Sequence, residues 1–283
     1  MFLDEPDMRL PNLSNMVTVG QIRYIQSVFE KPEHRNPDVV VREFLPRLQL
    51  WESRLRGRLT LGRMRSDPFY YYVLARTKYY DAVFIDAVAD RVDFIVHIGC
   101  GCDTRAYRFA HVLQQRGIVA VECDQPEAIV EKQRLAAERW PVDHVEYLPI
   151  DLNADGYPEL GEWLRRNASA RTLVLMEGVT PYVDAVAFGR FLDLLGTGLQ
   201  AGNRFAYDFK VRGVADDFGR SARTRTPFRL PADRAAVTEY HLAHRFELEH
   251  LELSADLSRR LAPSLSAGTP LFHEDALVRL IKC

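Results

Sequence analysis

Acidic side chains follow a series of short apolar segments in the middle of the chain. Asp124 comes after residues 118–121, Asp151 after 145–150 and Glu177 after 173–176, while Asp208 stands near the end of 204–209. Such segments are typical of buried strands, and parallel strands bring their carboxyl ends to one edge of a sheet. Carboxylates there can accept hydrogen bonds from the hydroxyl or ammonium groups of a ligand. A single acid could merely cap the following helix, but an ordered series favours a binding edge.

Two glycines end the first of these strands. Residues 94–98 form a β-branched apolar run, and Gly99 and Gly101 follow it. A strand, a glycine turn and a helix start let the backbone approach a nucleotide-like ligand. The dinucleotide fingerprint has a third glycine beneath the pyrophosphate, where this chain has Thr104. The loop therefore suits a nucleoside without a pyrophosphate, such as S-adenosylmethionine (SAM), although an ordinary strand-to-helix turn remains the alternative.

The acid after the second strand has the position of a ribose ligand. Asp124 follows the glycine loop by about 20 residues, the spacing at which a carboxylate holds a ribose diol. Glu122 lies two residues earlier. The alternative is that Asp124 only caps the helix that begins at Pro126.

A longer helix precedes the first strand. Pro68 opens it after the capping pair Ser66-Asp67, and the helical pattern runs to about residue 88. Tyr72, Arg76 and Tyr80 are four apart and therefore share one face. Without further information, an arginine between two tyrosines is equally well a surface cation–π arrangement.

Three segments resemble successive motifs of the leucine carboxyl methyltransferase family. They are HIGCGCDTRAYR at 97–108, VECDQPEAIVEKQR at 121–134 and LMEGVTPYV at 175–183, and the resemblance covers most of residues 66–209. That family includes enzymes that methylate a protein C-terminal carboxylate and bacterial relatives that methylate polyketide carboxylates. Gln125 departs from the pattern, in which leucine or phenylalanine is common. The family's lysine near the N-terminus has no clear counterpart.

The resemblance implies a cofactor, a set of site residues and a reaction. The cofactor is SAM, with Arg76 on its carboxylate, Gly99 and Gly101 against its backbone, Asp124 on the ribose, Asp151 and Leu152 beside the adenine, and Glu177 also at the cofactor. Tyr182 corresponds to a tyrosine beside the methyl-transfer centre and is the expected catalytic residue. The acceptor is a small-molecule or peptide carboxylate, which becomes a methyl ester.

Carboxylate methylation also agrees with the absence of a clear acid–base set in the sequence. A carboxylate is ionised at neutral pH, since its ordinary pKa is about 4, and it needs no general base. A hydroxyl acceptor would need a His or Lys near the methyl group, and His97 is expected to be a core residue within its strand. A hydroxyl methyltransferase, a nicotinamide oxidoreductase and a non-catalytic SAM-binding protein stay as alternatives.

Strands and helices alternate from residue 94 to residue 209, which predicts an α/β fold. The expected architecture is a doubly wound, mostly parallel sheet, Rossmann-like and of the class I methyltransferase type. We expect an N-terminal helical arm over residues 1–67, with helices at 17–29 and 39–50, and a methyltransferase domain over 68–283. A substrate-lid insertion is expected at about 210–270, with a strand at 246–253, a loop-rich stretch at 256–269 and a final strand at 276–281.

Composition limits the partners and the compartment. A net charge of −2, from 37 basic and 39 acidic residues, gives no field that would attract nucleic acid. No segment is apolar for the roughly 18 residues of a membrane span, so no membrane partner is expected. The acidic N-terminus lacks signal-peptide features, which predicts a cytoplasmic protein. Cys100, Cys102 and Cys123 lack the usual zinc spacing, so no metal is expected. Oligomeric state is open.

Overall fold

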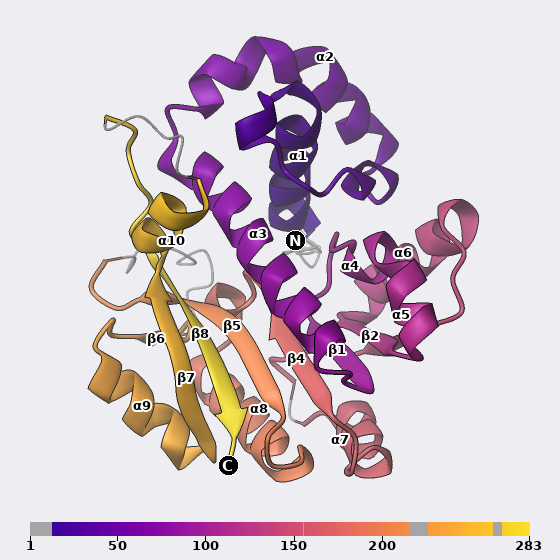
Figure 1. Ribbon diagram of the computed structural model, residues 1–283, viewed down its shortest axis with the longest axis vertical. Helices are drawn as coiled ribbons and strands as arrows, with labels where there is room; N and C mark the ends of the chain where they lie inside the picture. The colour runs from indigo at the N-terminus through magenta and orange to yellow at the C-terminus, as the bar shows by residue number, and fades with distance from the viewer. Residues whose placement is uncertain (1–12, 155, 215–225, 263–267) are drawn as a thin grey trace, which may run out of the picture.

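The computed structural model describes residues 13–154, 156–214, 226–262 and 268–283. Its centre is an eight-stranded sheet with the order β3-β2-β1-β4-β5-β8-β7, in which β6 pairs with β5 (Figure 1). Strands β1 to β5 are parallel, and β8 is antiparallel to both β5 and β7. The strands are β1 Phe94–Ile98, β2 Val119–Asp124, β3 Val145–Pro149, β4 Thr172–Met176, β5 Arg204–Val211, β6 Arg229–Leu230, β7 Phe246–Leu253 and β8 Asp275–Lys282. The predicted doubly wound sheet is confirmed.

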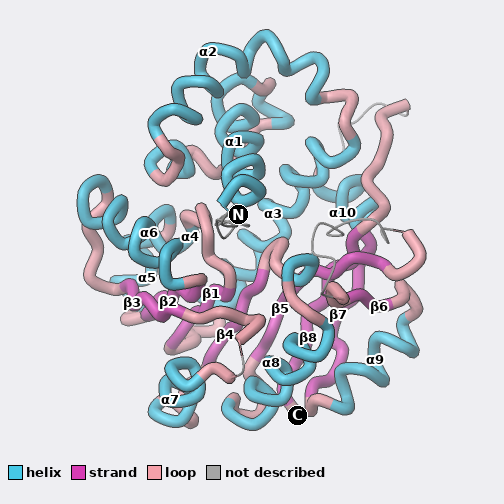
Figure 2. The backbone as a smooth tube through the Cα atoms, turned by 180° about the vertical axis from the view of Figure 1, so that it is seen from behind, coloured by secondary structure: helices cyan, strands magenta, loops and turns pink. Residues whose placement is uncertain are grey.

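Helices cover both faces of this sheet (Figures 1 and 2). One face carries α3 Pro68–Ala89, α5 Ala110–Arg116, α6 Pro126–Arg139 and α10 Ser254–Leu261, and the other carries α7 Pro158–Arg166, α8 Ala185–Gly198 and α9 Arg234–Ala243. The short helix α4 Arg105–Arg108 follows the glycine loop. Asp67 caps α3 as predicted, since its side chain accepts a hydrogen bond from the Phe69 N–H at 2.9 Å.

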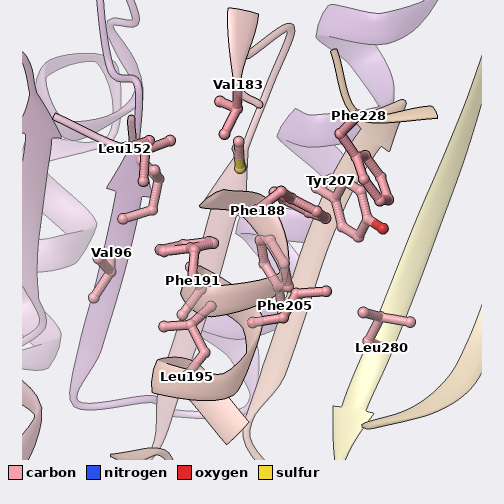
Figure 3. Close-up of a cluster of buried hydrophobic side chains, with 14 of the residues drawn as sticks. Val96, Leu152, Val183, Phe188, Phe191, Leu195, Phe205, Tyr207, Phe228 and Leu280 are labelled. Carbon is pink, nitrogen blue, oxygen red and sulfur yellow. The ribbon is translucent and has the colours of Figure 1, made fainter. Parts of the chain in front are cut away.

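Aromatic packing between α8 and the sheet fixes the strands that end at the site. Figure 3 shows Phe188 and Phe191 of α8 against Phe205 and Tyr207 of β5. The ring centroids of Phe188 and Tyr207 are 5.2 Å apart, and those of Phe205 and Tyr207 are 4.9 Å apart. All four rings are fully buried. The alternation of apolar residues along β5 therefore anchors one face of the sheet, while its carboxyl end remains available for polar residues.

The N-terminal arm differs from the predicted pattern. Helix α1 Leu13–Phe29 begins earlier than expected, and the predicted helix at 39–50 is wrong. A short 3₁₀ turn, Val40–Glu43, ends before Pro46, which cannot continue a helix because it has no backbone N–H. A second long helix, α2 Arg47–Met64, then begins directly after this proline. In Figure 1 the arm helices lie beyond the carboxyl ends of the parallel strands.

The C-terminal part contributes more to the sheet than expected. Strands at 246–253 and 276–281 are confirmed as β7 and β8, and α9 packs against β7. The loop-rich stretch expected from residue 256 is instead helical over Ser254–Leu261, and this helix packs against α3. Within the expected lid insertion at about 210–270, β6, α9 and β7 belong to the sheet layers. Residues 215–225 and 263–267 of that insertion lie outside the described residues, as do residues 1–12 of the arm. The lid function and the division at residue 67 stay predictions.

Candidate functional site

The glycine loop after β1 has a backbone that only glycine adopts readily. Gly99 has a φ of +67° and Gly101 a φ of +39°. A Cβ atom on Gly99 would lie 2.2 Å from Cγ2 of Val179, so a side chain there would collide with the segment after β4. The Thr104 hydroxyl donates to Asp38 in the arm, so the loop is tied to the helices that cover it.

Asp124 stands at the carboxyl end of β2, beside this loop. Its Oδ2 accepts a hydrogen bond from the Gly101 N–H and its Oδ1 accepts one from the Gln125 N–H, both at 2.8 Å. Helix α6 has Gln125 at its N-cap, and no side chain caps it. Burial raises the pKa of Asp124, although the two N–H groups oppose that shift. The carboxylate therefore organises the glycine loop and faces the cleft, while the capping alternative is not realised.

Two adjoining cavities meet at Gly99 and Asp124. Both are also lined by Val179 and Tyr182, so together they form one elongated cleft along the carboxyl edge of the sheet. The part toward β3 is bordered by the predicted adenine residues Asp151 and buried Leu152, with Gln125, Ile150, Asn153 and Val183 as further lining residues. The Asp151 Oδ1 accepts the Asn153 N–H at 2.9 Å.

Glu177 lies at the centre of a charge cluster in the other part of the cleft, the part toward α3. Three guanidinium groups contact its buried carboxylate: Arg23 at 3.0 Å, Arg76 at 3.1 Å and Arg105 at 3.0 Å. Burial alone would raise the pKa of Glu177, but the positive charges of Arg23, Arg105 and Arg76 lower it to about 2. The site therefore keeps an ionised carboxylate next to several cations, an arrangement complementary to a zwitterion.

Arg76 occupies the predicted position, on the buried face of α3. Its Nη1 lies 3.4 Å from Asp208 Oδ2, and its guanidinium carbon lies 5.3 Å from the centre of the Tyr72 ring. The Tyr80 hydroxyl donates to Asp208 Oδ1 at 3.1 Å. Burial raises the pKa of Asp208 to about 6, despite the charge of Arg76. The Tyr72–Arg76–Tyr80 face is therefore part of the interior, and the surface alternative is wrong.

Arg23 is a site residue that the sequence reasoning missed. It comes from α1 and lines the cleft beside Arg76 and Glu177. Its side chain is buried, its Nη1 lies 3.5 Å from Asp38 Oδ2, and within the described residues its Nε has no hydrogen-bond partner. A signal was available, because the family's N-terminal lysine had no clear counterpart in the arm. Arg23 therefore brings a positive charge from the N-terminal arm to the cleft.

His97 has more contact with the site than a core residue would. It is buried within β1, but its ring also lines the cleft, and its Nδ1 lies 3.4 Å from Asp103 Oδ1. The Asp103 carboxylate also contacts the Arg105 guanidinium, and the positive charge of Arg105 holds the pKa of Asp103 well below its usual range despite burial. Sequence spacing alone did not indicate this pair, since His97 lies six positions before Asp103.

Tyr182 closes the middle of the cleft. It belongs to the 3₁₀ turn Thr180–Tyr182 after β4, and it borders both parts of the cleft. Its carbonyl oxygen accepts a hydrogen bond from Asn153 Nδ2 at 2.9 Å, which ties this turn to the loop after β3. All eight residues predicted for the site thus fall around one cleft: Arg76, Gly99, Gly101, Asp124, Asp151, Leu152, Glu177 and Tyr182.

A larger hollow of about 440 Å³ lies at the opposite edge of the sheet. It is lined by residues at the amino ends of β4 and β5, where ligands of doubly wound sheets do not usually bind. Its charged groups pair with each other, as in the 2.6 Å contact of Arg204 with Asp90. In the described part of the chain, no group of three His, Cys, Asp or Glu side chains is placed to hold a metal ion. The carboxyl-edge cleft remains the candidate site.

Comparisons with known proteins identify the family of this chain. The sequence model of the family described as leucine carboxyl methyltransferase matches residues 21–196. A putative S-adenosyl-L-methionine-dependent methyltransferase of Mycobacterium ulcerans is 30% identical over 156 residues, which cover 54% of this chain and 48% of that protein. One from Mycobacterium avium is 34% identical over 143 residues, 50% of this chain and 45% of the relative. The chain thus spans about half the length of the curated relatives it matches.

Solved structures show a looser likeness. A magnesium protoporphyrin IX methyltransferase from Synechocystis PCC 6803 with bound SAH has a TM-score of 0.48 and 14% identity, over 80% of this chain and 94% of that one. The family match runs from the arm, including the position of Arg23, through the glycine loop and past Glu177. This chain belongs to the leucine carboxyl methyltransferase family.

Proposed function

We propose that this protein is a SAM-dependent O-methyltransferase that converts the carboxylate of a small molecule or peptide to a methyl ester. The observation that carries the proposal is the cleft that joins the Arg23–Arg76–Glu177 cluster to Asp124 and Leu152. Along this cleft lie first charged groups that are complementary to a zwitterion, then a carboxylate that can bind a diol, and finally an apolar wall that can contact a flat ring. Membership of the leucine carboxyl methyltransferase family, together with relatives described as SAM-dependent methyltransferases, supports SAM as the cofactor and methyl transfer as the reaction.

The residues present fit SAM. Arg76 and Arg23 would hold its carboxylate, and the unpartnered Nε of Arg23 is a buried donor that such an anion would satisfy. Glu177 would balance the ammonium group, while Asp124 would accept the ribose hydroxyls. Leu152 and the loop after β3 would border the adenine. Val179 leaves no room for a side chain at Gly99, so the loop backbone itself would contact the cofactor.

When bound, SAM would supply a methyl group activated by its sulfonium. The acceptor carboxylate provides an ionised oxygen at neutral pH, so the C–O bond can form without any proton transfer to the protein. The sulfur of the bound cofactor would be the leaving group, so the transfer would need no further co-reactant. The chain's task is then to orient the two reactants and to exclude water, which can supply much of the rate. Tyr182 would orient the acceptor or close the cleft, because it borders both parts.

The product identifies the reaction class. Methyl-labelled SAM should be consumed in the presence of an acceptor carboxylic acid, and the labelled product should release methanol in mild base. A methylated product that resists base would overturn the carboxylate assignment. SAM binding without any turnover over a broad panel of carboxylic acids would instead favour a non-catalytic SAM-binding protein.

One observation favours a second candidate, a hydroxyl O-methyltransferase. The His97 ring lines the cleft, and Asp103 could orient it as a general base for a hydroxyl acceptor. His97→Gln distinguishes the two reactions. A carboxylate methyltransferase should retain most of its turnover number in this variant, and a hydroxyl methyltransferase should lose about 100-fold or more.

In either case the four free cysteines suit the cytoplasmic location we propose.

A further inference from the structure

Helix α2 has two apolar faces, and the described part of the chain covers only one of them. Gly57 and Ser53 are buried against α1, and a Cβ atom on Gly57 would lie 2.9 Å from the Phe29 ring. Leu61 is also buried on this side. This close contact buries the inner face of α2 against α1, whereas the outer face stays exposed among the residues that the structure describes.

The outer face is a row of large apolar side chains. Leu48, Trp51, Leu55 and Leu59 are 68%, 60%, 57% and 84% exposed, respectively. Their spacing of three, four and four residues places them on one side of a helix with 3.6 residues per turn. The row extends over about 16 Å at 1.5 Å per residue. Single exposed leucines need no explanation, but a continuous row of this kind marks an interaction surface.

Arginines flank this row. Arg47, Arg54 and Arg58 are spaced by seven and four residues, so they follow one flank, while Arg63 lies on the other; all four are exposed. Arg54 contacts the Tyr24 hydroxyl at 3.3 Å. Over the residues that the structure describes, no carboxylate pairs with Arg47, Arg58 or Arg63. The surface is therefore both apolar and strongly basic, although the whole chain has a net charge of −2.

We propose that the outer face of α2 docks on an anionic lipid surface. Apolar side chains with a tryptophan, flanked by arginines, are the composition of helices that lie in the plane of the interface. Arginine stems can follow the apolar layer while their guanidinium groups reach the lipid phosphates. The helix lies at the outer end of the molecule and protrudes from it (Figures 1 and 2), so a broad, flat surface can reach it.

Charge and shape disfavour the other occupants. A second copy of the chain would bring arginine flanks against arginine flanks, since Glu52 is the only acidic residue in α2. A protein partner would need an acidic groove wide enough for a protruding row of four large side chains. In-plane binding also differs from the membrane contact that the sequence argued against. Among the described helices, none is long and apolar enough to cross a bilayer, but a helix lying at the surface does not have to cross it.

Vesicle binding tests this proposal with the full chain. The protein should co-sediment with phosphatidylglycerol vesicles and not with phosphatidylcholine vesicles, and added salt should weaken the binding. The emission of Trp51 should shift to shorter wavelength, and Trp51→Phe should remove that shift. The double variant Leu55→Glu/Leu59→Glu should lose at least tenfold in vesicle affinity. Val186→Glu on α8 is the matched control, since Val186 is 68% exposed on another part of the surface.

Both glutamate variants alter exposed positions, so each should keep the circular dichroism spectrum and SAM affinity of the parent. Three results would overturn the proposal. The first is no binding to anionic vesicles, and the second is equal binding by the double variant. The third is a concentration-dependent dimer, seen by analytical ultracentrifugation and abolished in the double variant, which would assign the face to a second copy. SAM binding is measured separately, so the lipid proposal can fail without affecting the proposed methyl transfer.

Discussion

The two halves of the cleft are built in different ways. The half toward β3 consists of strand ends and their loops: Gly99, Asp124 and Leu152 are held by backbone geometry and a few hydrogen bonds. The half toward α3 is a cluster of opposite charges, in which Glu177 is contacted by arginines 154, 101 and 72 positions away. One half depends on local structure, and the other depends on residues from four separate parts of the fold.

This difference determines how each half should respond to substitution. A change at a strand end removes one ligand contact and leaves the sheet intact. A change in the charge cluster removes a carboxylate that several buried cations share, which costs much more than the loss of one exposed contact. In the half toward β3, which we call the strand half, substitutions should lower SAM affinity with little change in stability. In the half toward α3, the helical half, they should lower both.

The largest effect is expected at the hub of the helical half. Glu177→Gln leaves three buried guanidinium groups without their shared carboxylate, so the free energy of unfolding should fall by about 3–5 kcal/mol. Denaturant titration measures it. Glu131→Gln is the control, because the 2.8 Å contact of Glu131 with Arg134 is exposed and should contribute less than about 1 kcal/mol. Equal destabilisation by the two substitutions would contradict the contrast between the halves.

The pH dependence of the free energy of unfolding should show the titration of Asp208, which contacts Arg76. Because burial raises the pKa of Asp208 from 3.8 to about 6, the folded state binds this proton more tightly than the unfolded state. The stability that protonation provides is therefore lost as the pH rises from about 4 to 6, by at most about 3 kcal/mol. Asp208→Asn should flatten this part of the profile in parallel denaturant titrations. An unchanged slope would show that Asp208 does not titrate in this window.

A smaller and more specific effect is expected in the strand half. Asp124→Ala should lose roughly 1.5–3 kcal/mol of SAM binding, or about tenfold or more in affinity, because a desolvated carboxylate no longer accepts the ribose hydroxyls. The free energy of unfolding should change much less than in Glu177→Gln. Asp143→Ala, at an exposed position before β3, should bind SAM like the parent. Unchanged SAM affinity in Asp124→Ala would show that Asp124 is not the ribose ligand.

Arg76→Lys sharpens the description of the helical half. Lysine retains the charge but cannot form a fork to two oxygens, so SAM affinity should fall severalfold even though the ion pair with Glu177 can persist. Isothermal titration calorimetry of Arg76→Lys beside Arg23→Lys would show which arginine dominates. Parental affinity in Arg76→Ala would mean that this arginine serves the fold rather than the cofactor.

Tyr182→Phe should have the smallest effect, and only on turnover. Removing the hydroxyl should lower kcat severalfold if it orients the acceptor, and the Kd for SAM should remain unchanged. Steady-state assays of methyl transfer and calorimetry on the same preparation separate the two. A change in SAM affinity with an unchanged kcat would place Tyr182 on the cofactor instead of the acceptor.

The same contrast explains what could be predicted from the sequence. The strand half follows from local signals, since Gly99 and Asp124 stand directly after apolar runs. Arg23 was missed because its link to Glu177 joins residues 154 positions apart. Helix α2 was missed because its two apolar faces lie opposite each other and cancel the usual one-sided pattern. The sequence patterns indicate where strands and helices end, but they do not indicate which charged residues from distant parts of the chain come into contact.

Calorimetric titration of the parent protein with SAM and, separately, with NAD tests the central claim most directly. The cleft should bind one SAM per chain, with both the Asp124→Ala and Arg76→Lys variants weaker, and it should give no heat with NAD, since Thr104 replaces the glycine needed beneath a pyrophosphate. Binding of NAD in place of SAM, or SAM affinity that neither substitution changes, would contradict the assignment of this cleft.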